Sequence, residues 1–246
     1  DTNPKMSTAD ELIRSMDKNG VDLSVVMGVG WNDQGLAREI NNYIIESVNL
    51  YPDRLRGFAS VNPSWGKAAV MEIERCAEAG IRGIGELHPD TQGFDLGDKN
   101  TMAPLIEISQ VYGLLITTHS SEPVGHTYQG KGRTGPKTLW EFVGNFPNTV
   151  LVCAHWGGGL PFYAMMPEVK KSLKNVYFDT AASPLLYNPQ VFSVATSIVG
   201  SNRILFGSDS PLVSSGRILS QIKKASLSEM EKAAISGKNA AHLLNI

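Results

Sequence analysis

The sequence has little cysteine, no long apolar run and no excess of charge of either sign. Its two cysteines, Cys76 and Cys153, lie in apolar stretches of a 246-residue chain. A disulfide framework is therefore not supported, and we expect buried free thiols in a reducing compartment. No apolar run approaches the roughly 18 residues of a membrane span, and there is no signal peptide. These absences predict a cytoplasmic protein.

Charge excludes further classes of partner. The net charge is −2 and no basic face is apparent, so neither a nucleic acid nor an acidic membrane surface is an expected partner. No G-x-G-x-x-G follows the first apolar run, and there is no P-loop, which removes the usual signs of nucleotide binding.

What the chain does contain is an alternation of strand-length apolar runs with helical patterns. The runs recur about every 30 residues, the size of one βα unit. We expect strands at 21–29, 55–61, 81–86, 114–118, 149–154, Val176–Asp179 and 204–206. Such alternation implies an α/β fold with a parallel sheet, either a doubly wound sheet or, as we favour, a (β/α)₈ TIM barrel.

Several helix ends are marked by their residues. Thr8 with Glu11 forms a capping box, and Gly20 ends that first helix. Pro189 is expected to open a helix that Gly200 closes. Residues 226–246 predict two short helices.

One strand of a closed barrel is not accounted for. Seven apolar runs are found, whereas a barrel of this kind needs eight strands. The first element is a helix, and residues 1–7 are too polar to be the missing strand. We expect that this sequence starts after the first strand, the alternative being an atypical barrel. Composition does not shift along the chain, so residues 1–246 are interpreted as one domain.

Metal-type ligands follow four of the predicted strands. Glu86 and His88 follow the run at 81–86, His119 follows 114–118, His155 follows 149–154, and Asp209 comes soon after 204–206. The carboxyl ends of parallel barrel strands lie on one face, where active sites form, so we expect these residues to converge. Imidazole and carboxylate are the ligands of a catalytic zinc or a similar ion, which makes hydroxide available at neutral pH.

Each of these residues also has a structural interpretation. A single histidine after a strand is more often a hydrogen-bonded structural residue, Asp209 could cap a helix, and Glu86 could pair with an arginine. The coincidence of His119, His155 and Asp209 favours the metal site over those alternatives.

Substrate contacts are expected from His88, His126 and Trp156. His126 lies in a long glycine-rich loop, 119–135, and long loops in compact domains are usually functional. His88 and His126 could equally be solvated loop residues, and Trp156 could either wall the pocket or pack on the barrel rim. The expected partner is a small-molecule substrate, and a homodimer is left open.

These residues carry a resemblance to the amidohydrolase superfamily, in its branch that includes aminocarboxymuconate-semialdehyde decarboxylase. The matching pieces are GFASVNP (57–63), GIRGIGELHP (80–89), THS (118–120), HWGGGLP (155–161), YFDTAASP (177–184), FGSDSP (206–211) and NAAHLL (239–244). The resemblance spans nearly the whole chain, and it is the order and spacing of these pieces that is specific.

The resemblance implies roles for individual residues. His119 matches the metal-binding histidine of the fifth barrel strand, and His155 matches that of the sixth, which is catalytic or binds a second ion. Asp209 matches an aspartate of the eighth strand that binds metal and accepts a proton. Glu86 matches, by position alone, a bridging carboxylate. The family's His-x-His pair is absent from the sequence, and its expected place is the missing strand.

Three functions follow as hypotheses. The leading one is a hydrolase in which a divalent ion, Zn²⁺ by expectation and one or two in number, activates water against a C–N or C–O bond beside a carbonyl, with Asp209 and His155 as catalytic residues. The first alternative is nonoxidative decarboxylation of a small unsaturated or aromatic acid. The second is a non-catalytic binding barrel with a degenerate site.

Overall fold

The computed structural model describes residues 6–246, and its centre is a curved sheet of seven parallel strands. The strands lie in sequence order across the sheet, each paired in parallel with the next. Their bounds are β1(Ser24–Val26), β2(Leu55–Ala59), β3(Gly83–Leu87), β4(Leu115–Thr118), β5(Leu151–Cys153), β6(Val176–Asp179) and β7(Ile204–Leu205). The predicted α/β barrel-like architecture is confirmed, with several strands shorter than predicted.

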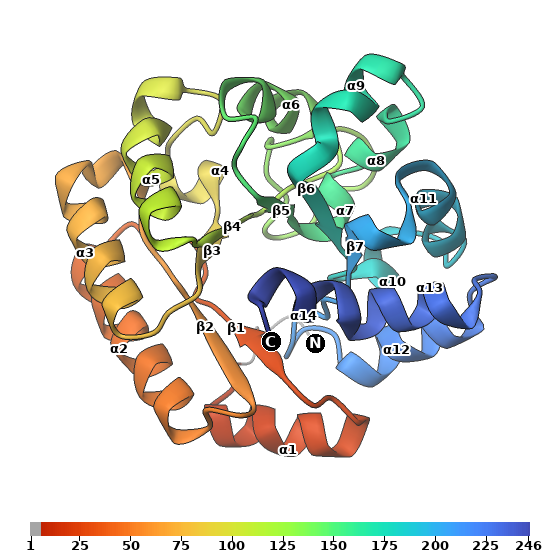
Figure 1. Ribbon diagram of the computed structural model, residues 1–246, viewed down its shortest axis with the longest axis horizontal. Coiled ribbons are helices and arrows are strands. Elements are labelled where there is room, and N and C mark those ends of the chain that lie inside the picture. Colours follow the sequence, from red (N-terminus) through yellow and green to blue (C-terminus); the bar gives the residue numbers. More distant parts are fainter. Residues whose placement is uncertain (1–5) are drawn as a thin grey trace.

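Helices surround the sheet on its outer side (Figure 1). The helix α1(Ala9–Asn19) precedes the first strand. The other long helices follow strands: α2(Gln34–Leu50), α3(Lys67–Glu78), α5(Lys99–Tyr112), α6(Pro136–Asn145), α11(Val191–Val199) and α12(Ser215–Lys224). Short helices and turns complete the chain: η1(Pro63–Trp65), α4(Pro89–Gln92), α7(Ala154–Gly157), α8(Leu160–Tyr163), α9(Pro167–Ser172), η2(Leu173–Asn175), α10(Ser183–Leu186), η3(Ser201–Arg203), α13(Glu229–Ala233), η4(Ala234–Lys238) and α14(Asn239–Leu244).

The predicted helix ends are largely confirmed. Thr8 and Glu11 form the capping box of α1, and Gly20 ends that helix in the left-handed conformation, with φ of 68°. Gly200 is the residue at which α11 ends, but this helix begins at Val191 rather than at Pro189. Local hydrogen bonding by Ser, Thr and Gly at helix ends explains why these boundaries could be predicted.

The sheet is open between its two edge strands. Within residues 6–246, no strand pairs with the free edges of β1 and β7. Met16 of α1, Val21 and Leu55 form an apolar cluster there, and Phe206 and Leu219 pack against it. This cluster joins the two ends of the sheet by side-chain packing. The prediction for residues 1–5 lies outside the described residues.

The largest apolar core lies between the sheet and the helices α3, α5 and α6. Ile84, Ile116 and Leu151, one from each of three adjacent strands, are completely buried, and Ile73 and Leu105 pack with them from the helices. Burying a side chain of this size contributes about 1.5–3 kcal/mol. The core therefore holds the middle strands rigidly.

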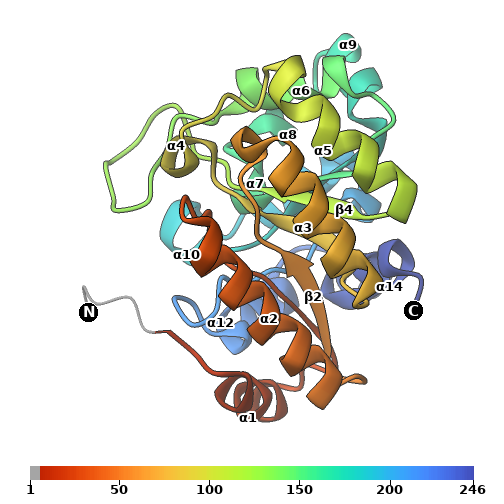
Figure 2. The same ribbon diagram turned by 90° about the vertical axis from the view of Figure 1, so that its left-hand side faces the viewer.

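Rigid middle strands fix the positions of the loops that follow them. The long loop between β4 and α6 projects on the side of the molecule away from α14 (Figure 2). Because all seven strands run in the same direction, every loop that follows a strand starts on that same face. The site described next lies at these strand ends.

Candidate metal centre

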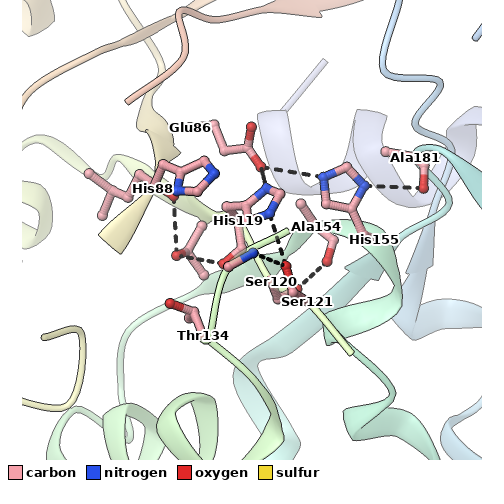
Figure 3. A network of polar contacts seen from close by, with 12 residues as sticks. Glu86, His88, His119, Ser120, Ser121, Thr134, Ala154, His155 and Ala181 are labelled. Atoms are coloured by element: carbon pink, nitrogen blue, oxygen red, sulfur yellow. Dashed lines mark hydrogen bonds and ion pairs between the residues drawn. The ribbon is translucent and has the colours of Figure 1, made fainter. Parts of the chain in front are cut away.

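Three predicted ligands come together at the ends of the middle strands. Glu86 lies in β3, His119 directly follows β4, and His155 lies in the short turn α7 that follows β5. One donor atom from each lies within 4.8 Å of the others. Figure 3 shows the Glu86 carboxylate between the two imidazole rings.

The position of Glu86 depends on an irregularity in β3. The register between β3 and β4 shifts between Ile84 and Leu87, and such bulges re-aim side chains near active sites. Gly85 permits this, since a Cβ there would lie 2.7 Å from the carbonyl oxygen of Thr117. The backbone N–H of Glu86 donates to the carbonyl of Gly28, at 3.0 Å, which ties this part of β3 to the loop after β1.

Two of the donor separations are close to those around a single divalent ion. His119 Nδ1 lies 3.2 Å from Glu86 Oε1, and His155 Nε2 lies 3.7 Å from the same oxygen. Ligand bonds of about 2.0–2.2 Å place neighbouring donors of a tetrahedral or octahedral ion about 3.0–3.6 Å apart. The donor set of two imidazole nitrogens and one carboxylate oxygen therefore fits a divalent metal site.

Hydrogen bonds hold the two histidine rings in a metal-binding orientation. His155 Nδ1 lies 3.3 Å from the carbonyl oxygen of Ala181, which can only accept, so Nδ1 carries the proton and Nε2 offers its lone pair on the side of Glu86. His119 Nε2 lies 3.2 Å from Ser121 Oγ. When Nε2 donates to that hydroxyl, Nδ1 is left free to bind an ion beside Glu86.

The charges at this site are strongly coupled. Burial alone would raise the pKa of Glu86, but the hydrogen bond from His119 and the charges of His119 and His155 lower it to about 2. Burial lowers the pKa of His155, and the negative charges of Glu86, Asp179 and Asp209 outweigh it, so its pKa is raised. Glu86 thus stays ionised at neutral pH, as a metal ligand must.

Asp209 lies near this group without belonging to it. It follows the edge strand β7, is exposed, and is not part of the cluster of three donors. Its φ is 65°, in the left-handed region. Partial desolvation raises the pKa of its carboxyl group, the charge of His155 opposes this rise, and that of Glu86 adds to it. Its predicted role as a metal ligand therefore stays a prediction.

The predicted substrate residues have different surroundings. The ring of His88 stacks on that of His119, with centroids 4.1 Å apart. His126 is exposed, and its ring lies 5.6 Å from that of Tyr128. Trp156 is completely buried, and its Nε1 donates to Ser183 Oγ at 2.6 Å. Trp156 has a φ of 58°, and its ring packs in an apolar cluster with Phe192. Its predicted contact with a substrate stays a prediction.

The loop between β4 and α6 is tied down at its far end. The carboxylate of Asp90 accepts bonds from the backbone N–H groups of Arg133 and Thr134, at 2.7 and 3.1 Å. The guanidinium of Arg133 pairs with the same carboxylate, and the ammonium of Lys131 donates to two carbonyls of its own loop. Both cations are thus engaged within the protein.

Two residues of the site were missed from the sequence. Ser121 contacts His119, and Asp179 accepts a bond from the backbone N–H of His155 at 2.9 Å. Burial raises the pKa of Asp179 to about 6. Asp179 is the last residue of β6, and its position at a strand end was the available signal. In the described part of the chain, no helix is both long and apolar enough to cross a membrane.

Comparison with known proteins identifies relatives over nearly the whole chain. A family model described as amidohydrolase matches residues 4–246. The chain is 22% identical over 294 aligned positions to gamma-resorcylate decarboxylase of Polaromonas sp. (strain JS666), covering 96% of this chain and 87% of that protein. It is 22% identical over 287 positions to 2-amino-3-carboxymuconate-6-semialdehyde decarboxylase of Dictyostelium discoideum, covering 96% and 76%.

Solved structures share the fold. The 5-carboxyvanillate decarboxylase of Sphingomonas paucimobilis superposes with a TM-score of 0.81 at 18% identity, covering 98% of this chain and 84% of that one. A dihydroxybenzoic acid decarboxylase of Polaromonas sp. JS666, solved with manganese and the inhibitor 2-nitroresorcinol, gives 0.73 at 20% identity, covering 98% and 86%. At these identities the likeness shows the fold alone.

Proposed function

The chain belongs to the amidohydrolase family, and on that premise we propose that it is a metal-dependent, nonoxidative decarboxylase of a small aromatic or unsaturated acid. The observation that carries the proposal is the group formed by Glu86, His119 and His155 at the strand ends. Two curated relatives are named as decarboxylases. These names support the decarboxylase hypothesis over hydrolysis, which was the leading expectation from the sequence.

The donor group also bears on the non-catalytic alternative. That hypothesis depended on the missing His-x-His pair, yet Glu86 completes a set of three donors without it. A divalent ion bound there would orient the substrate's oxygens and stabilise their negative charge. Zinc is not confirmed as the ion, since a solved structure of similar fold contains manganese. A site with carboxylate and imidazole donors accommodates either ion.

Decarboxylation requires a residue that donates a proton to the substrate. A proton is added to the carbon that bears the carboxylate, the bond to that carboxylate breaks, and CO₂ leaves while its bonding electrons return to the ring or double bond. Both ring nitrogens of His155 are engaged, one with Ala181 and one facing Glu86. Asp209, whose pKa is raised, is therefore proposed as the group that carries this proton.

The test is CO₂ release by the intact protein on a panel of hydroxybenzoic and unsaturated carboxylic acids. The protein is assayed after chelation and after reloading with Mn²⁺ or Zn²⁺, with metal content measured in parallel. We expect CO₂ release that depends on the metal. Turnover of esters, lactones or amides without CO₂ release would instead support hydrolysis.

Variants separate metal binding from proton transfer. His119→Ala should lose both metal and activity, and Asp209→Asn should lose activity while retaining metal on Glu86, His119 and His155. His242→Ala is the matched control, since His242 is exposed on α14. Full metal occupancy in His119→Ala would contradict the proposed site.

A further inference from the structure

One oxygen of Asp179 joins the ends of two strands. Oδ1 accepts the backbone N–H of His155 at 2.9 Å and the backbone N–H of Ala181 at 3.0 Å. We propose that Asp179 is a positioning residue that holds His155 in its metal-binding orientation. The inference rests on one part of the proposed function, that the site binds a metal ion. It does not depend on which reaction the protein catalyses.

The backbone that carries His155 has an unusual conformation. Five consecutive residues have positive φ: His155 at 55°, Trp156 at 58°, Gly157 at 58°, Gly158 at 57° and Gly159 at 95°. Two of the five are not glycine, and L-residues disfavour this region because Cβ approaches the following carbonyl. Such a turn persists only where its surroundings hold it. The bond from the N–H of His155 to Asp179 acts on the first residue of the turn.

Asp179 also acts on the ring of His155, through Ala181. The carbonyl oxygen of Ala181 accepts a hydrogen bond from His155 Nδ1 at 3.3 Å, while the backbone N–H of Ala181 donates to Asp179. The carboxylate therefore fixes the backbone that carries the ring and the backbone that the ring contacts. Figure 3 shows the ring of His155 between Ala181 and Glu86. Loss of the carboxylate would free both supports at once.

The segment that follows β7 leaves room for this carboxylate and confines it. A Cβ on Gly207 would lie 3.2 Å from both Cβ and Cγ of Asp179. Thr180 Oγ1 donates to the carbonyl of Gly207 and accepts its N–H, at 2.9 and 3.0 Å. Asp179 therefore has little freedom to turn away from His155.

The experiment compares Asp179→Asn with Asp179→Leu. Asparagine keeps an oxygen that can accept both N–H groups, whereas leucine has nearly the same size and no acceptor. The probe is Co²⁺ added to metal-free intact protein, and the readouts are its dissociation constant and the visible d–d absorption, which reports coordination geometry. Far-UV circular dichroism and the melting temperature of the metal-free variants show whether each one folds.

We expect Asp179→Asn to bind Co²⁺ within about threefold of the unaltered protein and with the same spectrum. Asp179→Leu should weaken binding by about 10–100-fold, the usual effect of removing a support behind a ligand, and should change the spectrum. If the leucine variant does not fold, Gly207→Ala crowds Asp179 without removing its acceptor and should change the spectrum in the same direction.

Other outcomes overturn the proposal. An unchanged spectrum and affinity in folded Asp179→Leu would show that His155 does not depend on this carboxylate. A loss in Asp179→Asn as large as that in Asp179→Leu would show that the oxygen acceptor is not what matters. If the protein released no CO₂ from any acid, the proposed function would fail while these metal measurements kept their meaning.

Discussion

The imidazole rings of His88 and His119 lie face to face, with centroids 4.1 Å apart and planes inclined by 9°. Burial lowers the pKa of His88, and the charge of a protonated His119 lowers it further. A neutral His88 therefore covers one face of a metal-binding ring. His88 also accepts the N–H of Thr91 on Nδ1, at 3.3 Å, as the first turn of α4 begins.

Replacing His88 should separate these two roles. His88→Phe keeps a flat ring over His119 but loses the hydrogen bond that caps the N-terminus of α4. His88→Ala loses both the ring and this hydrogen bond. We expect His88→Ala to weaken metal binding about tenfold and His88→Phe to stay within about threefold, as measured by metal titration. Equal losses in the two variants would assign the effect to the cap of α4.

The carboxylate of Asp90 should control the order of the loop between β4 and α6. Burial would raise the pKa of Asp90, but the bonds from Arg133 and Thr134 lower it. This anchoring is complete above the ordinary pKa of 3.8 and is lost as the pH falls through the lower value of the folded protein. Asp90→Asn should speed hydrogen exchange in residues 122–134 at neutral pH, measured by mass spectrometry.

The control for that variant is Asp98→Asn. It makes the same change of charge at the N-cap of α5, where asparagine caps equally well. Faster exchange in the β4–α6 loop of the control would mean that charge, rather than the bonds to Asp90, orders the loop.

Glu72 should make stability depend on acid pH. Its side chain is 11% exposed and lies 2.6 Å from Arg75, and it accepts a bond from Asn41 at 2.9 Å. Burial raises its pKa, but these partners outweigh burial and the net pKa is lowered. The stabilisation is therefore complete above the ordinary pKa of 4.5 and is lost as the pH falls through the lower folded value.

Glu72→Ala should cost about 1–3 kcal/mol of unfolding free energy at pH 7, since it removes the charged partner of Arg75 and one hydrogen bond of the buried Asn41. Urea denaturation at pH 7 and near pH 3 should show this cost shrinking in acid. Glu46→Ala, on the exposed side of α2, is the control and should change stability little at either pH. A cost that does not vary with pH would argue that packing, not charge, explains the effect.

Gly158 should be intolerant of a side chain. Its φ is +57°, and a Cβ there would lie 2.3 Å from the backbone oxygen of Ser121. Gly158→Ala should therefore cost more than the roughly 1–2 kcal/mol of the left-handed conformation alone, because the loops after β4 and β5 must also move apart. Thermal unfolding measures this loss.

Gly144→Ala provides the opposite expectation. Nothing lies within 4 Å of a Cβ at this position in α6, so alanine should stabilise the helix by about 0.5–1 kcal/mol. A Gly158→Ala variant as stable as the unaltered protein would show that the turn at 155–159 can relax.

Local sequence rules determined much of this protein. The apolar runs predicted all seven strands in order, and β6 matches its predicted bounds, Val176–Asp179. Capping by Thr8 and termination by Gly20 were also predictable. His119 and His155 could be predicted because residues that follow parallel strands lie on one face of the sheet, however far apart they are in the sequence.

The tertiary structure decided which of those residues touch. Glu86 faces the histidines because β3 shifts register, Trp156 is buried although it follows a ligand, and Asp179 reaches His155 across 24 positions of sequence. Periodicity reports which face of a strand is buried, but a bulge or a run of positive φ redirects side chains over one or two residues. Those turns are set by packing between neighbouring loops, so only the folded chain shows where the donors converge.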